Sequence, residues 1–407
     1  MELHLSANDV IKFIIDYGID PYEMCPCGSG RKYKWCCKQN IKECKNTNEL
    51  RALYHKLKID VWNRNKWKPH NCHWKGCKEK AQYCHSIQNN RFLNQISGVR
   101  KEVYHFIPMG TMGKEEVRLK DETISFASTF EGFCNRHDRE LFAIIEGNNE
   151  IIYSLEQLYA FVYRNFYYML YKHEIMQEIV ISASLRSMPK YYQKNFRPKR
   201  KEQFELAVDK IVELREKQMS YEQMQQITSD IALNYDEDTK CWRIKDETLI
   251  FSKIRTVTVK NAFFCFQTVR EYLLKNEFEQ MYKNPSIEIL NDRRYNYIST
   301  IILPNTKTSE ITIFFAISKR HKTKSPLEFI KYINKCTDKE LINITNNIVL
   351  DAYEELYISK SRLYDMFTHE EQVTIQNIFT HKTFGKSHVT LLDDILSKSK
   401  FDFINLA

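Results

Sequence analysis

The sequence lacks the segments that mark exported and membrane proteins. No uncharged apolar run approaches the roughly 20 residues that a transmembrane helix needs. The first residues, Met1–His4, are polar and show no basic and apolar leader, so no secretory signal is expected. The richest apolar stretch, Tyr159–Tyr171, is interrupted by Arg164 and Asn165 and predicts a buried helix. We therefore expect a cytoplasmic protein with no membrane partner.

Several enzyme signatures are also missing. The sequence contains no Gly-rich phosphate loop, no G-x-S-x-G and no H-E-x-x-H. An NTPase, an α/β-hydrolase and a zincin peptidase therefore have no support. The chain shows no internal repeat and no long low-complexity linker, and its 407 residues are enough for two or three globular domains.

The positive charge of the chain lies near its N-terminus. The formal net charge is +9. Residues 19–80 hold fifteen Lys or Arg and six Asp or Glu, and 15 − 6 = +9, so the rest of the chain is balanced. A basic segment interleaved with aromatic residues suits a polyanion such as nucleic acid; a solvated, lysine-rich surface is the alternative. The aromatic residues in question are Tyr33, Trp35, Trp62, Trp67 and Trp74.

Twelve cysteines in a chain with no export signal favour metal binding over a disulfide framework. Four of them, Cys25, Cys27, Cys36 and Cys37, fall within thirteen residues as C-x-C-x8-C-C around a Gly-Ser-Gly turn. Two cysteine pairs on either side of a tight turn supply the four ligands of a tetrahedral zinc ion. A bridge between the adjacent Cys36 and Cys37 would be strained, which weakens the disulfide alternative.

Residues 20–40, and above all Cys25–Cys37, resemble the SEC-C motif. This small zinc finger occurs at the C-terminus of the translocase ATPase SecA and as an addition to many bacterial proteins. The resemblance implies an N-terminal zinc finger in a first domain of residues 1–45. It also implies a possible adaptor role, in which the finger docks a protein partner or the ribosome. A capping-box-like start at Ser6–Asp9, followed by apolar residues at helical spacing, predicts a short helix before the finger.

A second set of metal ligands follows. Cys72 and Cys77 form a C-x4-C pair, and Cys134 and His137 form a C-x2-H pair at the start of a predicted helix. A cysteine knuckle with a second ligand pair at a helix N-terminus is the layout of a treble-clef zinc site. We predict that these four residues bind a second zinc ion. Cys84 is either a substitute ligand or a small buried thiol.

The phrase Cys84–Ile87 resembles the H-x-I-P segment of HNH (ββα-metal) nucleases. In that family the histidine is the general base that activates water, while a divalent ion stabilises charge on the leaving side. The resemblance implies that His85 is the base, that Asp138 is a metal ligand, and that Mg²⁺ or Mn²⁺ is a further cofactor.

The chain departs from the HNH pattern in three places. Gln88 replaces the usual proline, and Leu141 and Phe142 stand where the family places its last catalytic residue. No residue is assigned to the family's middle asparagine, although Asn89, Asn90 and Asn94 follow His85. His85 is therefore also open to interpretation as the relic of a catalytic fold that is kept for binding, or as a structural histidine bonded to a loop carbonyl. Residues 72–142 as a whole resemble a segment of uncharacterised bacterial proteins associated with phage defence.

The remaining sequence predicts an α+β fold. A helix is expected within residues 46–67, and long helices over 154–187 and 198–230. Short strands are expected near 249–251, 257–259 and 263–266, a β-hairpin over 297–303 and 310–317, and mostly helix from 326 onward. We expect a zinc module over 46–150 and a mainly helical body with a small β-sheet over 151–407. The leading hypothesis is a nucleic-acid-directed protein, an HNH-like nuclease in phage defence; the alternative is a non-catalytic adaptor.

Overall fold

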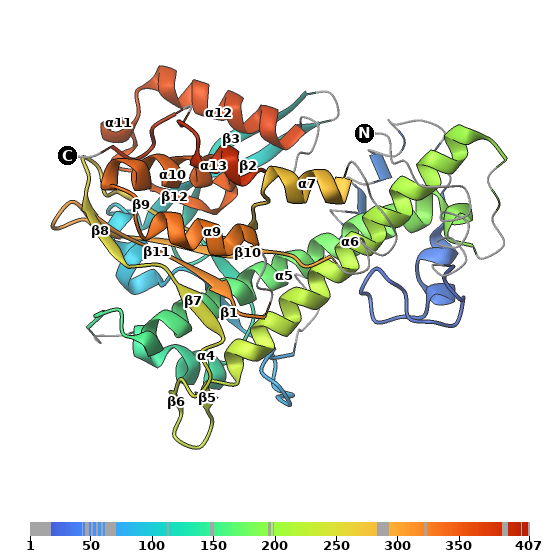
Figure 1. Cartoon of the computed structure of the whole chain (residues 1–407), viewed down its shortest axis with the longest axis horizontal. Helices are drawn as coiled ribbons and strands as arrows, with labels where there is room; N and C mark the ends of the chain where they lie inside the picture. Colours follow the sequence, from blue (N-terminus) through green and yellow to red (C-terminus); the bar gives the residue numbers. More distant parts are fainter. Residues whose placement is uncertain are drawn as a thin grey trace. The chain divides into compact units, whose positions relative to one another are not determined.

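The computed structural model describes residues 18–42, 44, 49, 52–53, 56–57, 60–61, 71–111, 114–146, 150–193, 197, 199–282, 293–320, 324–384, 390–399 and 401–405. The helix predicted after Ser6–Asp9, and also Trp62 and Trp67, lie outside these residues. The chain forms two compact units, each built from separate segments (Figure 1). Unit 1 is Met1–Pro69, Leu170–Gln226 and Asn276–Tyr295; unit 2 is His70–Met169, Ile227–Lys275 and Asn296–Ala407.

Unit 2 is built around an antiparallel sheet of eight strands in the order β3-β2-β12-β9-β10-β11-β7, with β8 also paired to β11. The strands are β2 Glu102–Thr111, β3 Lys114–Thr123, β7 Leu249–Phe251, β8 Arg255–Thr258, β9 Phe264–Glu271, β10 Tyr297–Asn305, β11 Glu310–Ser318 and β12 Leu356–Ser359. The predicted hairpin is confirmed as β10 and β11, with Ile298 opposite Ile317.

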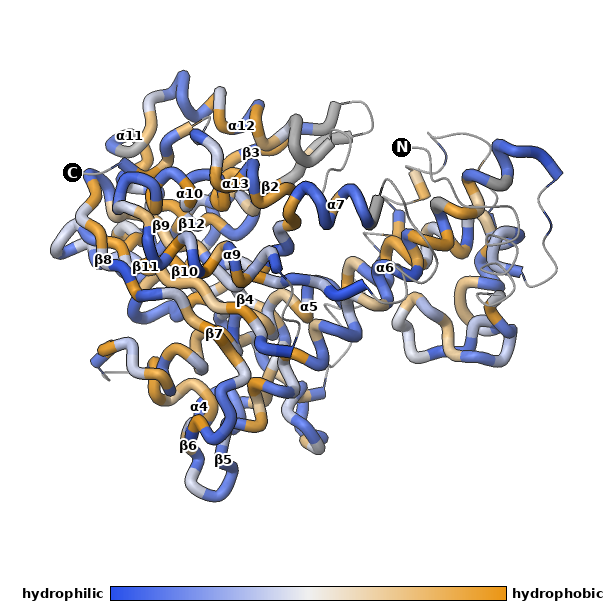
Figure 2. Tube along the Cα trace, viewed as in Figure 1, coloured by the Kyte–Doolittle hydropathy of each residue, from blue (hydrophilic) through white to orange (hydrophobic). Residues whose placement is uncertain are grey.

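Helices cover both faces of this sheet, which explains why its strands are apolar on both sides. On one face, Ile313, Phe315 and Ile317 pack with α9 Lys324–Ile333, α10 Asp338–Asp351, α12 His369–Phe384 and α13 Leu392–Leu396. The hydropathy colours of Figure 2 show β10 and β11 as largely hydrophobic. On the other face, Phe314 contacts Phe161 of α5 at 6.1 Å between ring centroids. The sheet is therefore the middle layer of three.

The sheet is larger than the small one that the sequence predicts. The prediction of mostly helix from residue 326 onward agrees with α9, α10, α12 and α13, and β12 is the one strand in the described part of this region. It pairs with both β2 and β9 at the centre of the sheet. A four-residue apolar run does not distinguish strand from helix by periodicity. Strands on both sides of residue 150, the predicted domain boundary, thus pair within one sheet. The α+β class itself agrees with the observed mixture of helices and sheet.

Long helices dominate unit 1. The predictions for residues 154–187 and 198–230 are confirmed as α5 Leu155–Ser187 and α6 Lys201–Ala232, of which Leu170–Ser187 and Lys201–Gln226 belong to this unit. Ile181 and Leu185 of α5 pack with Ile211 and Leu214 of α6. The described residues between 49 and 61 are helical, and their buried side chains contact α5, in agreement with the helix predicted within 46–67.

The remaining elements are short, and they include the strand that carries His85 and the helix that carries His137. They are η1 Tyr33–Trp35, η2 Cys37–Asn40, β1 Tyr83–His85, the π-helical turn η3 Asn89–Leu93, α3 Asn94–Ile96, β4 Thr129–Glu131, α4 Asn135–Phe142, η4 Ala143–Ile145, η5 Pro189–Tyr192, β5 Tyr235–Asp236, β6 Cys241–Trp242, α7 Lys275–Tyr282, η6 Tyr353–Glu355 and α11 Leu363–Met366. None of the helices in the described residues has the length and apolar character needed to cross a bilayer.

Candidate metal centres

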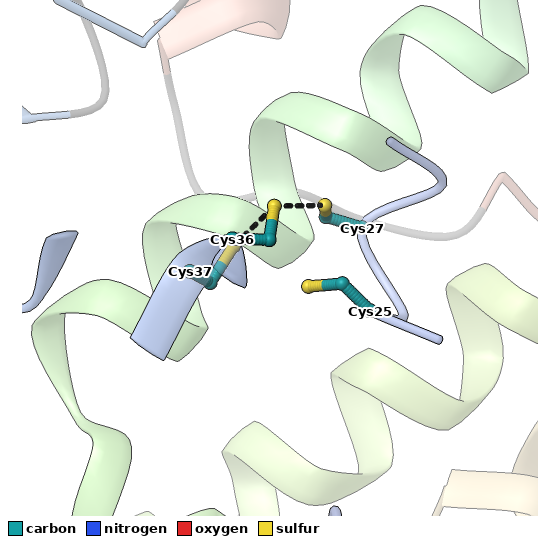
Figure 3. A group of neighbouring side chains, drawn as sticks. All are labelled: Cys25, Cys27, Cys36 and Cys37. Carbon is teal, nitrogen blue, oxygen red and sulfur yellow. Dashed lines mark hydrogen bonds between the residues drawn. The ribbon is translucent and has the colours of Figure 1, made fainter. Parts of the chain in front are cut away.

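The four N-terminal cysteines converge on one point. Their sulfur atoms all lie within 4.8 Å of one another, and all four residues are buried (Figure 3). The Sγ of Cys36 is 3.5 Å from that of Cys27 and 4.0 Å from that of Cys37. A tetrahedral zinc ion with Zn–S bonds of about 2.3 Å places its sulfurs about 3.8 Å apart. The four side chains therefore fit a zinc ion as they stand.

The turn between the two cysteine pairs explains this convergence. Gly28 and Gly30 adopt positive φ angles of 80° and 68°, which other residues rarely adopt. The sulfur of Cys36 lies 3.0 Å from Ser29 Oγ and 3.8 Å from Arg31 Nη2. Hydrogen bonds from the other thiols, Cys25 first, together with Ser29 lower the pKa of Cys36. This favours the thiolate, the form that binds metal, at Cys36, whereas the hydrogen bonds among the thiols raise the pKa values of Cys25 and Cys37.

Unit 1 holds this finger at both ends. The backbone N–H of Ile19 donates to the carbonyl of Tyr192, and that of Lys42 donates to the carbonyl of Arg186, each at 3.0 Å. The cysteines and Tyr33 also belong to the hydrophobic core that α5 and α6 form. The finger therefore shares the core of these helices.

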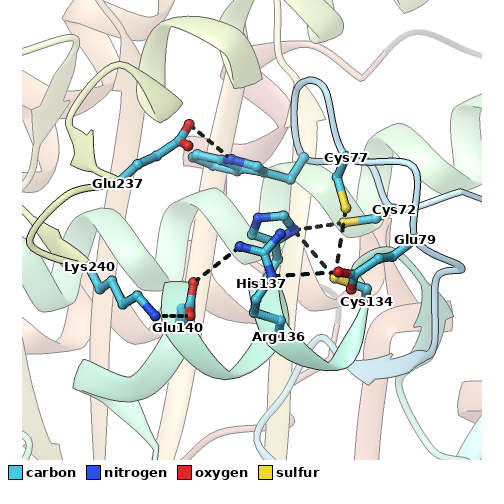
Figure 4. A network of polar contacts seen from close by, with 10 residues as sticks. Cys72, Cys77, Glu79, Cys134, Arg136, His137, Glu140, Glu237 and Lys240 are labelled. Atoms are coloured by element: carbon cyan, nitrogen blue, oxygen red, sulfur yellow. Dashed lines mark hydrogen bonds and ion pairs between the residues drawn. The ribbon is translucent and has the colours of Figure 1, made fainter.

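The second predicted ligand set also comes together. The ligand atoms of Cys72, Cys77, Cys134 and His137 lie within 4.8 Å of one another (Figure 4). Nδ1 of His137 is 3.3 Å from the sulfurs of both Cys72 and Cys134, and the sulfurs of Cys77 and Cys134 are 4.0 Å apart. Tetrahedral zinc with nitrogen and sulfur ligands requires N–S separations of about 3.5 Å. The set fits a metal ion through Nδ1 of the histidine.

Two local structures bring these ligands together. Gly76, with φ 78°, turns the chain between Cys72 and Cys77. Cys134 is the N-cap of α4, so His137 lies on the first turn of the helix. Strands β1 and β4 pair antiparallel immediately before α4, with Cys84 opposite Phe130. The four ligands thus join a knuckle to a ββα unit made of β1, β4 and α4.

Charged and aromatic side chains surround the second centre. Arg136 lies 3.7 Å from Glu79 and 3.9 Å from Glu140, and Glu140 also pairs with Lys240 (Figure 4). Such exposed pairs contribute little to stability. The packing of Trp74 is more substantial: its ring lies 5.6 Å from that of His137. The indole N–H of Trp74 donates to Glu237 at 3.1 Å. The centre is therefore packed against the β5–β6 segment.

Cys84 belongs to neither centre. Its thiol donates to the carbonyl of Gln82 at 3.4 Å, and burial raises its pKa. The interpretation as a small buried thiol therefore describes it better than the interpretation as a substitute ligand.

His85 ends strand β1 and has both ring nitrogens engaged. Nδ1 lies 3.0 Å from the carbonyl oxygen of Ala127, and Nε2 lies 3.3 Å from the amide nitrogen of Asn89. A carbonyl only accepts, so Nδ1 carries the proton and Nε2 accepts from the amide. Burial lowers the pKa of His85. The imidazole is thus neutral at pH 7, with its basic nitrogen at Nε2.

The carbonyl that fixes His85 belongs to a strained turn. Ser128 has a positive φ of 58°, which is costly for a residue with a side chain. Its N–H donates to the hydroxyl of Tyr357, its hydroxyl exchanges hydrogen bonds with the backbone of Ile87, and its carbonyl accepts from Ser86. Sequence reasoning missed this turn, since Tyr357 lies 229 positions away and no motif connects the two residues.

Three charged residues lie close enough to His85 to affect its pKa. The charges of Asp138 and Glu146 act to raise the pKa of His85 and the charge of Arg164 acts to lower it, all by less than burial does. Arg164 is only 2% exposed and pairs with Glu146 at 2.5 Å. Oδ1 of Asp138 is buried and has no hydrogen-bond partner among the described residues. Leu141 and Phe142, which stand where HNH nucleases have their last catalytic residue, are fully buried and belong to the hydrophobic core.

In the described part of the chain, only the two groups above bring together three or more potential metal ligands. Asp138 is in neither, so these residues form no third metal site on their own. Comparisons with curated proteins and with solved structures gave no match. The scan against protein families gave a match to the SEC-C motif over residues 23–39. The chain thus carries a SEC-C motif whose cysteine cluster is able to bind a metal ion.

Proposed function

We propose that this protein acts on nucleic acid, with His85 as the general base of an HNH-like, metal-dependent phosphodiester hydrolysis. The observation that carries the proposal is the fixed orientation of His85. A strained turn holds Nδ1 through the Ala127 carbonyl, and burial keeps the ring neutral. Residues held at unfavourable backbone angles cluster at functional sites, and Ser128 is one of five non-glycine residues with positive φ in the described part of the chain.

The reaction would proceed by general base catalysis. Nε2 of His85 takes a proton from water as the water oxygen attacks phosphorus, and the bond from phosphorus to the leaving sugar oxygen breaks. The amide of Asn89, which donates to Nε2 in the structure, would give way to the attacking water. A Mg²⁺ or Mn²⁺ ion bound by Asp138 and the substrate phosphate would stabilise the charge on the leaving oxygen.

The two candidate zinc centres have a structural role in this proposal. Each supplies four protein ligands, whereas catalytic zinc sites keep one position open for water. The second centre joins the knuckle to α4, and β1, which carries His85, pairs with β4 immediately before that helix. A metal ion there would hold the ββα unit in shape.

A cleavage assay tests the proposal. Single- and double-stranded DNA and RNA are incubated with the full chain and Mg²⁺ or Mn²⁺, and His85→Ala is compared at matched zinc content. Loss of a general base lowers rates by roughly 100-fold or more. His369→Ala, which changes an exposed histidine, serves as the control and should cut like the parent.

Equal cutting by the parent and by His85→Ala would refute the assignment of His85 as the base. No cutting by either protein would favour the adaptor alternative, in which the SEC-C finger docks a protein partner or the ribosome. The role in phage defence and the cytoplasmic location stay predictions.

A further inference from the structure

The SEC-C finger carries an exposed aromatic face. Tyr22, Met24 and Trp35 are 62%, 61% and 53% exposed. Backbone hydrogen bonds from Tyr33 to Glu23 and from Lys34 to Pro21, with a bridge between Met24 and Lys32, place residues 21–24 beside residues 32–35. The three apolar side chains therefore belong to one small surface, which we call the aromatic face (Tyr22, Met24, Lys34 and Trp35).

The core of the finger does not need these rings. Its structural aromatic residue is Tyr33, which is only 4% exposed and packs with the cysteines. Grouped exposed apolar side chains are typical of interaction sites. Trp74, which also contributed to the aromatic pattern of the basic segment, is 6% exposed and so cannot stack on a ligand. Among the described residues of that pattern, Trp35 is the exposed one.

A cation lies between the two exposed rings. Nζ of Lys34 is 4.8 Å from the ring centroid of Tyr22 and 4.7 Å from that of Trp35, and 3.5 Å from the hydroxyl of Tyr22. Cation–π contacts of this kind hold an ammonium group in a defined place. The face thus presents one positive charge flanked by two aromatic rings.

The rest of the finger is also basic. Residues 18–42 hold five Lys or Arg and two acids, and 5 − 2 = +3. The −2 charge of a zinc ion with four thiolates lies inside, where Ser29 and Arg31 face the sulfur of Cys36. Lys32, Lys38 and Lys42 are exposed. An anionic partner with flat apolar groups complements such a surface.

We infer that the aromatic face binds single-stranded nucleic acid, with bases stacked on Trp35 and Tyr22 and a phosphate paired with Lys34. Sequence-tolerant binders of single strands combine aromatic platforms with basic side chains in this way. In a duplex the bases are stacked on one another and are not available to the rings. The inference takes nucleic acid as the partner from the proposed function. It adds that this nucleic acid is single-stranded, and it names the residues that contact it.

Fluorescence anisotropy tests this inference. The full chain carrying His85→Ala is used so that the probes are not cut. The probes are labelled 20-nucleotide dT and U strands and a DNA duplex of mixed sequence at low salt. We expect the single strands to bind more tightly than the duplex, and Trp35→Ala to weaken binding roughly tenfold. Lys34→Gln should lower the slope of log affinity against log salt by about one.

Two substitutions in unit 2 serve as controls: Tyr332→Ala removes an exposed ring, and Lys339→Gln removes an exposed charge. Both should bind like the parent at equal zinc content. Unchanged affinity in Trp35→Ala, or equal binding of duplex and single strand, would overturn the inference. So would binding of anionic vesicles or an acidic protein through Trp35 in the absence of any strand binding.

The outcomes for the two proposals are separable. Strand binding that depends on Trp35, together with no cleavage by the parent protein, would refute the nuclease and keep the aromatic face. Cleavage that depends on His85, together with strand binding that Trp35→Ala does not change, would refute only the aromatic face.

Discussion

At the residue scale, the surroundings of His85 determine which of its two nitrogens is basic. The Ala127 carbonyl fixes the proton on Nδ1, and the buried position disfavours the imidazolium. A histidine in water titrates near 6.5, so a lowered pKa keeps His85 neutral below that pH. The same ring is thus a competent base over a wider acidic range than a free histidine.

The pH dependence of cleavage follows from this shift. If His85 is the base, the rate should decline as the pH falls, with the midpoint of the decline below pH 6.5, since activity requires the neutral ring. The measurement is kcat/KM between pH 4.5 and 8. A decline centred at or above 6.5 would show that another group, or an unshifted histidine, limits the rate.

The lowered pKa of His85 also makes the stability of the folded protein depend on pH, and stability falls in the same direction as the rate. Between the lowered pKa of folded His85 and the value near 6.5 in the unfolded chain, the unfolded state binds more protons. The folded protein therefore loses stability as the pH falls through this window. Because Asp138 and Glu146 oppose the shift and Arg164 supports it, changing any of these charges would move the window.

At the element scale, α10 shows how strongly local sequence determines a helix. Its N-cap, Thr337, accepts a hydrogen bond from the Glu340 N–H at 3.3 Å, and the Glu340 carboxylate accepts from the Thr337 N–H at 2.8 Å. This capping box satisfies backbone donors that would otherwise have no partner at the helix start. The helix then covers the sheet with Ile344, Ile348 and other apolar residues.

Removal of this cap should destabilise the protein by a modest amount. Thr337→Ala removes the hydroxyl that accepts from Glu340 and should lower the free energy of unfolding by about 1 kcal/mol. Urea denaturation followed by circular dichroism measures the change. Thr374→Ala, which alters an exposed residue inside α12, is the matched control. An equal loss in both variants would argue against the cap.

Elements with strong local signals were predictable, and elements defined by distant partners were not. The spacing of Cys25–Cys37 and the break-free runs of α5 and α6 are visible within one segment. By contrast, β12 has four residues, and only its pairing with β2 and β9 makes it a strand. The His85 site has the same limitation, because Ser128 and Tyr357 come from other parts of the chain.

At the scale of the whole molecule, metal ions bound at the two candidate centres would close loops of very different length. The first spans thirteen residues, whereas the second joins Cys72 and Cys77 to Cys134 and His137 across more than fifty. Closing a longer loop costs more chain entropy, so a metal ion there constrains more of the unfolded chain. Metal binding and folding are therefore coupled in different ways at the two sites.

Loss of the metal ion from either centre should increase hydrogen exchange only in the elements around that centre. Cys27→Ser should release one zinc per chain and expose amides of the finger and the α5 and α6 residues that pack on it. Cys134→Ser should release the other and expose β1, β4 and α4. Zinc analysis and hydrogen exchange measured by mass spectrometry test this. The same global exchange pattern in both variants would show that the two centres do not act locally.

The late place of β12 in the chain determines when the central sheet can be completed during synthesis. This strand, Leu356–Ser359, joins the β2–β3 pair to β9, yet it is synthesised more than 240 residues after β2 and more than 80 residues after β9. Until then β2 and β9 each present an unpaired edge, and unpaired edges invite association with other chains. The sheet of a nascent chain therefore stays incomplete for longer than its many local helices would suggest.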